Sequence, residues 1–275
     1  MKKILIWVLV AASCLFAEVG AVNDSKVSTY LRGALLDVDS VKSKLSEGGF
    51  TVLSSSAINE SGTLTSVVFT DDSLISLANK KSRGFMASLR VLVDNENSQI
   101  SITNPFYFSK AFMQVDNDEA VALATLSKLT KVFSGLKDSK EKLKYKKLSG
   151  YHFMFGMPYY DEMATVGSAG SSSELLERLK AKDGGANLIF SQKLSQDRIL
   201  VGVKLSNETS KFIEKIGVEN ASLLPYPVLL ENGKAKILAP KYYLAISYPL
   251  LKMAQFMTIS SVPSAIEKDC KKLFK

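Results

Sequence analysis

The chain has few of the residues from which metal sites and catalytic sites are built. Its 275 residues include two cysteines and one histidine, His152. Two cysteines exclude a disulfide scaffold and a four-cysteine metal site, and one histidine excludes a multi-histidine zinc site. No serine stands in a Gly-x-Ser-x-Gly elbow, and the glycine-rich run at 167–173 lacks the lysine and the spacing of a phosphate-binding loop. We therefore expect no enzyme activity and no cofactor.

Arginine is also scarce. The sequence has 35 basic residues, of which five are arginine, against 27 acidic residues, and its formal net charge is +8. Proteins that read nucleic acids usually enrich arginine, because its planar fork matches phosphate groups and guanine edges. A surplus made mainly of lysine is typical of a solvated surface. The composition therefore predicts no nucleic-acid partner.

The first 17 residues are typical of a bacterial secretory signal peptide. Two lysines precede an apolar run at 4–12, and Ala17 stands just before the first acidic residue. No other segment approaches the roughly 18 consecutive apolar residues of a membrane span, so we expect a periplasmic protein with no transmembrane segment after signal removal. Cleavage after Ala17 is favoured, with Ala21 as a second position. A weak lipobox at Cys14 leaves open a membrane-tethered lipoprotein.

Short segments recur along the chain at a nearly constant spacing, which predicts an internal duplication. A helix-like segment ends in two glycines in each half, and similar strand-like and hairpin segments follow in the same order. The matching segments are 47–49 with 183–185, 67–72 with 203–208, 91–95 with 228–232, and 105–108 with 240–243. Four matches in one order predict a first repeat at 24–135, a lysine-rich linker at 136–149 and a second repeat at 150–275.

Each repeat is predicted to have an α+β fold with a strand, a helix, about four antiparallel strands and a closing helix. Asp37 and Asp71 are placed to cap the first two helices of the first repeat. Apolar and aromatic runs are interpreted as further strands, and the run at 167–173 as a flexible connection. The expected strands that matter most below are Tyr107–Met113, Tyr151–Tyr160 and Tyr242–Ile246.

The repeated segments resemble a known family. The helix ending in Gly-Gly, the Val-Phe-Thr-Asp-Asp segment at 68–72, the Val-Leu-Val-Asp-Asn hairpin at 91–95 and its Asn-Pro-Phe-Tyr exit together resemble the bacterial domain-of-unknown-function 302 family. The resemblance covers roughly 24–135 and 148–275. It implies two tandem two-layer α+β domains of the TATA-binding-protein type and no known enzyme activity. The Ala-Cys-Asn-Pro segment of the family's short form is missing, so no thiol role carries over.

The leading hypothesis is an exported, non-enzymatic binding or interaction protein. A small apolar ligand or a periplasmic partner protein would lie between the repeats or on a sheet face. Tyr107, Tyr242 and Tyr243 occupy matching places in the two repeats and are candidate ligand contacts. Met253 and Met257 stand one helical turn apart and could line an adaptable apolar pocket.

Two alternatives stay open. The segment 151–163 concentrates His152, Met154 and Met157, and imidazole with thioether ligands suits Cu(I). The chain would then be a periplasmic copper-handling protein. A cryptic enzyme whose site spans both repeats is the other alternative.

Overall fold

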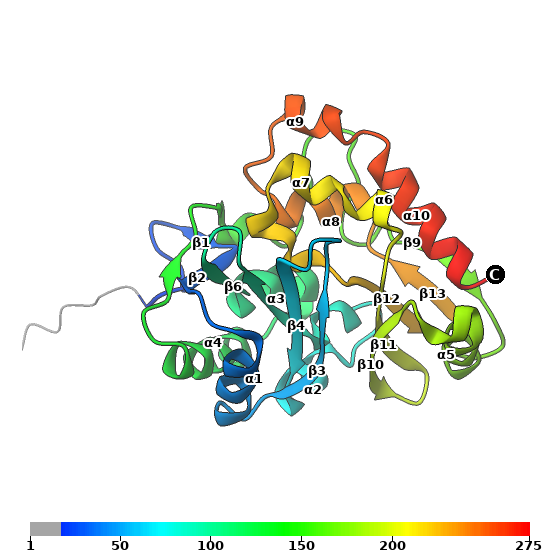
Figure 1. The fold of residues 1–275 in the computed structure, drawn as a ribbon, viewed down its shortest axis with the longest axis horizontal. Helices are drawn as coiled ribbons and strands as arrows, with labels where there is room; N and C mark the ends of the chain where they lie inside the picture. The colour runs from blue at the N-terminus through cyan, green and yellow to red at the C-terminus, as the bar shows by residue number, and fades with distance from the viewer. Residues whose placement is uncertain (1–17) are drawn as a thin grey trace, which may run out of the picture.

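The computed structural model describes residues 18–275 (Figure 1). The expected signal peptide, its cleavage site at Ala17 and Cys14 lie outside the described residues. The first half of the chain contains β1 (Lys26–Ser28), β2 (Tyr30–Ala34), α1 (Val38–Glu47), β3 (Thr51–Ala57), β4 (Leu64–Thr70), α2 (Asp72–Ala78), the 3-10 turn η1 (Gly84–Ala87), β5 (Leu89–Asp94), β6 (Gln99–Thr103), α3 (Pro105–Met113), η2 (Gln114–Asp116), α4 (Glu119–Val132), β7 (Lys137–Asp138), β8 (Lys142–Lys144) and η3 (Tyr145–Lys147).

The second half repeats much of this order. It contains β9 (Ala164–Ser168), α5 (Ser172–Ala181), η4 (Lys182–Gly185), β10 (Leu188–Ser195), β11 (Arg198–Val203), α6 (Asn207–Ser210), α7 (Phe212–Ile216), η5 (Val218–Leu223), β12 (Tyr226–Glu231), β13 (Lys234–Ile237), α8 (Pro240–Ser247), α9 (Met253–Thr258) and α10 (Val262–Leu273). None of the helices in the described part of the chain has the length and hydropathy needed to cross a lipid bilayer.

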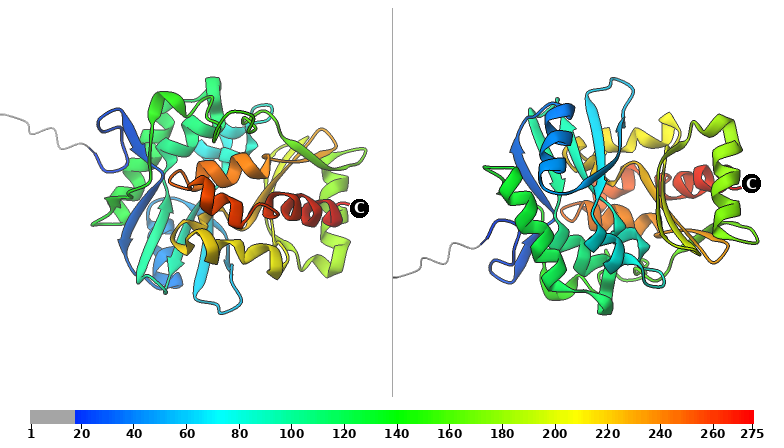
Figure 2. Two further views of the ribbon diagram at one scale, coloured as in Figure 1. Left: turned by 90° about the horizontal axis from the view of Figure 1, so that it is seen from above. Right: turned by 90° about the horizontal axis from the view of Figure 1, so that it is seen from below.

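Two antiparallel sheets have corresponding strand orders. The first runs β3-β4-β5-β6-β2-β7 and the second runs β10-β11-β12-β13-β9, while β1 and β8 form a separate pair. The first sheet lies toward the left of Figure 1 and the second toward the right. Figure 2 shows from above and below that the start of the described chain and the C-terminus lie at opposite ends of the molecule. The α+β class is confirmed.

Local capping signals explain where several elements begin. The Asp37 carboxylate accepts a hydrogen bond from the Ser40 amide at the start of α1 (2.8 Å), and Asp71 accepts from the Leu74 amide at the start of α2 (2.8 Å). Both aspartates satisfy amides that have no partner inside the helix. Gly49, with a φ of 75°, then turns the chain from α1 into β3. These helix starts are confirmed as predicted.

The predicted strands Tyr107–Met113 and Tyr242–Ile246 are wrong, because both segments are helical. They form α3 and α8, each with proline at its first position. The Asn104 side chain caps α3 by accepting a hydrogen bond from the Phe106 amide at 2.9 Å. Proline fits the first turn of a helix, where its missing N–H removes no hydrogen bond. Because α3 and α8 are buried on nearly every side, their sequences lack the polar face that marks a surface helix.

Three other expectations change. The segment Tyr151–Tyr160 is a loop with a tight turn at Gly156 (φ 77°), not a strand. The lysine-rich segment expected as a solvated linker forms β7, β8 and η3, and β7 pairs with β2 in the first sheet. The segment 167–173 is not a flexible connection, because Gly167 lies in β9 with no room for a β-carbon beside Phe274, and Ser171 caps α5.

A reciprocal pair of hydrogen bonds joins α3 and α8. The Tyr107 hydroxyl donates to the Ile246 carbonyl at 2.8 Å, and the Tyr242 hydroxyl donates to the Ala111 carbonyl at 3.2 Å. Tyr242 and Ile246 each stand 135 residues after Tyr107 and Ala111, so each helix makes the same contact to the other. Both carbonyls lie in the last turn of a helix, where carbonyl groups lack partners inside the helix. Two-fold pseudosymmetry therefore relates the two halves at this contact.

The two halves also exchange segments. We call residues 72–87 and 207–223 the crossing segments. Turn η1 of the first packs against β11 and β12 of the second sheet, and η5 of the second packs against β5 and β6 of the first sheet. Gly84 approaches Leu229 so closely that an added β-carbon would overlap its side chain. Each sheet is thus completed by residues from the other half.

Removing either tyrosine hydroxyl is expected to destabilise the protein. Tyr107→Phe and Tyr242→Phe each leave a buried helix carbonyl without its tyrosine donor, so each should lower the free energy of unfolding by about 1 kcal/mol. Urea unfolding followed by circular dichroism measures this change. The matched control is Tyr159→Phe, since that side chain is 46% exposed and should show no loss. Unchanged stability in both test variants would show that the hydroxyls do not hold the two helices together.

Candidate ligand cavity between the two halves

A cavity with a volume of about 340 Å³ lies between the two halves. The first half contributes the end of β3 and the following loop, residues 56–60. The second half contributes residues from β10, β11, α6, α7 and the segment before β12. The cavity is therefore lined by residues from both halves of the chain.

The meeting of two edge strands creates this space. β3 and β10 stand at the edges of their sheets and contact each other, but they do not pair with each other. Because β3 and β10 belong to different sheets and are not hydrogen-bonded to each other, a space remains between them wherever side chains do not fill it. The crossing segment 207–223 covers this gap through α6 and α7 and supplies part of the cavity wall.

The floor of the cavity is apolar. Val203, Leu205 and Ile213 are buried there and belong to the hydrophobic core. Further apolar groups complete the wall: Ala57, Ile58, Ile189, Leu224 and Pro225. An enclosed apolar floor with a polar opening is the usual construction of a small-molecule site.

Polar side chains from both halves meet at the rim. Asn207 donates from Nδ2 to Glu60 Oε1 at 2.9 Å, and Lys211 Nζ lies 3.5 Å from Glu60 Oε2. Hydrogen bonding to Glu208, followed by the charges of Glu208 and Glu60, raises the pKa of Lys211 above its ordinary value. These groups are exposed, and exposed ion pairs contribute little to stability. The contacts of Glu60 with Asn207 and Lys211 therefore link the two halves at the opening of the cavity but contribute little to stability.

The cavity wall holds serines but no histidine or cysteine, and none of its residues forms a nucleophile–base pair. Within residues 18–275, no group of three or more histidine, cysteine, aspartate or glutamate side chains is placed to hold a metal ion.

The three tyrosines predicted as ligand contacts lie elsewhere. Tyr107, Tyr242 and Tyr243 are buried, and none lines the cavity. The Tyr243 hydroxyl donates to the Leu223 carbonyl at 3.2 Å, so all three hydroxyls bond to backbone. Burial raises the pKa of all three hydroxyls, and they remain protonated donors.

The structure brings the two methionine-containing segments together. Phe153 in the loop packs against Phe256 of α9, with ring centroids 5.8 Å apart. Met253 and Met257 on α9 and Met154 in the loop are exposed, and Phe155 at the turn is fully exposed. The loop that carries the predicted copper ligands therefore contacts the helix that carries the predicted methionine pair, and none of these five residues lines the cavity.

The residues that line the cavity were not predicted. They come from several separate elements, and only the meeting of β3 with β10 brings them together. The duplicated pattern did predict both strands, but a strand pattern carries no information about which edge faces which sheet.

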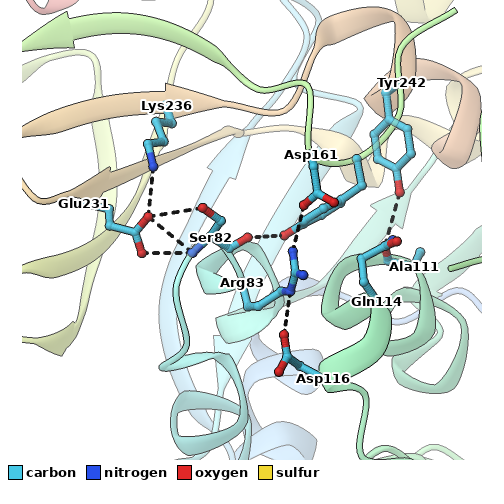
Figure 3. A network of polar contacts seen from close by, with 10 residues as sticks. Ser82, Arg83, Ala111, Gln114, Asp116, Asp161, Glu231, Lys236 and Tyr242 are labelled. Atoms are coloured by element: carbon cyan, nitrogen blue, oxygen red, sulfur yellow. Dashed lines mark hydrogen bonds and ion pairs between the residues drawn. The ribbon is translucent and has the colours of Figure 1, made fainter. Parts of the chain in front are cut away.

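A second cluster of charged groups joins the halves and is structural (Figure 3). Glu231, which is 1% exposed, accepts hydrogen bonds from the Ser82 amide at 3.0 Å, from Arg198 Nε at 2.7 Å and from Lys236 Nζ at 3.0 Å. Arg83 next to Ser82 pairs with Asp161 of the second half at 3.0 Å. Each charged group in this cluster is already paired with a group of opposite charge. The cluster therefore links the two halves, and we call it the Glu231 latch.

No protein-family model, no curated protein and no solved structure matches the chain. The resemblance to the domain-of-unknown-function 302 family therefore stays a prediction from the sequence.

The Glu231 latch is expected to make the free energy of unfolding depend on pH. Burial alone would raise the pKa of Glu231, but hydrogen bonds from Ser82, Arg198 and Lys236 outweigh it and lower the pKa below its ordinary value. A carboxylate with a lowered pKa stabilises the fold above its unfolded pKa, and that stabilisation is lost as pH falls through the folded pKa. Glu231→Gln should therefore be less stable at pH 7 and lose less further stability between about pH 5 and pH 3.

The measurement is urea unfolding at several pH values. Glu47→Gln is the control, because Glu47 is exposed and should leave the acid dependence unchanged. Equal acid dependence in Glu231→Gln and the wild type would contradict the role given to the latch.

Proposed function

We propose that the chain is an exported, non-enzymatic binding protein that holds a small apolar ligand in the cavity between its halves. The observation that carries the proposal is the cavity itself, with its apolar floor and its rim shared by both halves. Export to the periplasm is supported by the signal-peptide pattern of residues 1–17. The tandem TATA-binding-protein-like arrangement is part of the same proposal and is supported by the corresponding strand orders of the two sheets.

The cavity limits the class of ligand. Its volume of about 340 Å³ is near the lower end of the range of about 300–1,000 Å³ for ligand cavities, which favours a small molecule. Burying apolar area against Val203, Leu205 and Ile213 supplies the binding free energy, since removal of apolar surface from water is favourable. The rim carries both signs of charge, from Glu60, Glu214, Lys204 and Lys211, so a polar end of the ligand would face it.

Native mass spectrometry tests whether a ligand is present. The mature protein, purified from the periplasm of its own host, should show extra mass that is lost on denaturation. The lost mass would identify the ligand. A bare protein mass would contradict a tightly held ligand, and the mass of the N-terminus would distinguish cleavage after Ala17 from lipidation of Cys14.

Blocking the cavity should reduce probe binding. Ala57→Trp adds an indole ring to the cavity wall, so it should weaken binding of 1-anilinonaphthalene-8-sulfonate by about tenfold, or about 1.4 kcal/mol. Fluorescence titration measures the dissociation constant. Ser55→Trp is the matched control, because Ser55 lies on the same strand, is exposed and does not line the cavity. Equal affinity in both variants would place the probe elsewhere.

Copper handling is the second candidate. His152 Nδ1 lies 2.7 Å from the Met154 carbonyl, which only accepts, so the ring carries its proton on Nδ1 and leaves the Nε2 lone pair free. Met154 is 37% exposed in the same turn. These two observations favour a Cu(I) site made by His152 with Met154 and Met157.

Retention of copper tests this candidate. The wild type should hold one Cu(I) per chain under reducing conditions, and His152→Ala should lose it, as measured by metal analysis after gel filtration. Met163→Leu lies outside the turn and should retain copper. Absence of copper from the wild type after loading would exclude this function.

A further inference from the structure

A small second cavity lies at the contact between the halves, where polar groups from both halves stand among apolar side chains. Its volume is about 10 Å³, enough for one sphere of about the size of a water molecule. Ser88 and Arg90 from the first half and Ser222 and Ser247 from the second half are among the residues that line it. It is separate from the ligand cavity described above.

Arg90 brings an uncompensated positive charge to this cavity. The residue is 4% exposed, and no ion pair within residues 18–275 includes it. One guanidinium nitrogen donates to the Pro225 carbonyl at 3.2 Å, while Nε has no hydrogen-bond partner. A guanidinium does not lose its proton in a protein, so the charge stays. Burying a charge without a counter-charge is strongly unfavourable.

Three buried hydroxyl groups join Arg90 around the same cavity. Ser88, Ser222 and Ser247 are at most 3% exposed, and the hydroxyl oxygen of each lacks a hydrogen-bond partner. Buried polar groups in native proteins almost always have a partner. No acidic side chain lines the cavity. The site therefore gathers four unused donors, one of them charged, and offers no negative group to receive them.

We propose that this cavity binds a monovalent anion of about the size of chloride. The small volume, about 10 Å³, favours a single small anion over phosphate, sulfate or an organic carboxylate. A water molecule would satisfy the hydroxyls but would leave the Arg90 charge uncompensated, whereas a halide neutralises that charge and accepts from all the donors. Because both halves supply donors, the anion links them at the pseudo-two-fold contact.

Chloride-dependent stability tests the proposal. The melting temperature of the full mature protein should rise with sodium chloride and reach a plateau, because a ligand that binds only the folded state stabilises it. Sodium gluconate at the same ionic strength should not produce this rise, since gluconate is too large for the cavity. Crystals soaked in sodium bromide should show an anomalous peak beside Arg90. Equal melting curves in both salts, or a water molecule at this position in bromide, would overturn the proposal.

Two variants separate this site from general salt effects. Arg90→Met removes the charge and should abolish the difference between chloride and gluconate, while Arg178→Met, an exposed arginine on α5, should keep it. Ser222→Ala removes one donor and should shift the chloride midpoint to at least severalfold higher concentration. If Arg90→Met does not fold, Ser222→Ala decides the question, and an unchanged midpoint in that variant would overturn the proposal.

Discussion

The reciprocal contact between α3 and α8 holds the two halves of this protein in register. Tyr107 and Tyr242 each cap the last turn of the opposite helix from a fully buried position, so a shift of one helix breaks both hydrogen bonds at once. Buried polar groups are expensive to leave without partners, which makes this contact specific as well as stabilising. With the two helices held in register, each crossing segment reaches the sheet of the other half. Both cavities are consequences of that one alignment, because each is lined by residues of both halves.

Matching backbones carry different chemistry in the two halves. Asp94 and Glu231 both end the third strand of their sheets and are both buried. Asp94 accepts hydrogen bonds from Asn97 and Gln99 in its own hairpin, whereas Glu231 accepts from Ser82 in the other half. Arg90 is likewise unmatched, since the strand position paired with it by the repeat is Pro227. Two-fold pseudosymmetry therefore describes the packing and not the polar sites, and the buried charge of Arg90 comes from the first half alone.

Sequence patterns that depend on a few neighbouring residues predicted helix starts and strands well. They did not predict how these elements assemble. Asp37 and Asp71 cap helices where their positions indicated, because a cap depends on a few neighbouring residues. The duplicated segments predicted corresponding strands in the two sheets.

The helices α3 and α8 were missed because they are apolar on nearly all faces, so their sequences look like buried strands. The Asn104-Pro105 start of α3 was the signal that could have corrected this prediction. The cavities could not be predicted, since they depend on which sheet edges meet. Arg90, the one charged residue in the mainly apolar run at 85–93, was a visible sign of a polar site at the contact.

The crossing segments have a consequence for how such a chain can be divided. Each sheet is covered by a segment from the other half, which is the arrangement found when two identical subunits exchange an element. A chain of half this length with the same pattern would leave part of its own sheet uncovered and its own segment exposed, unless it paired with a second copy. The single chain described here is therefore equivalent to a domain-swapped dimer whose subunits have been joined covalently. The join frees each half to change its side chains independently, which an assembly of identical subunits cannot do.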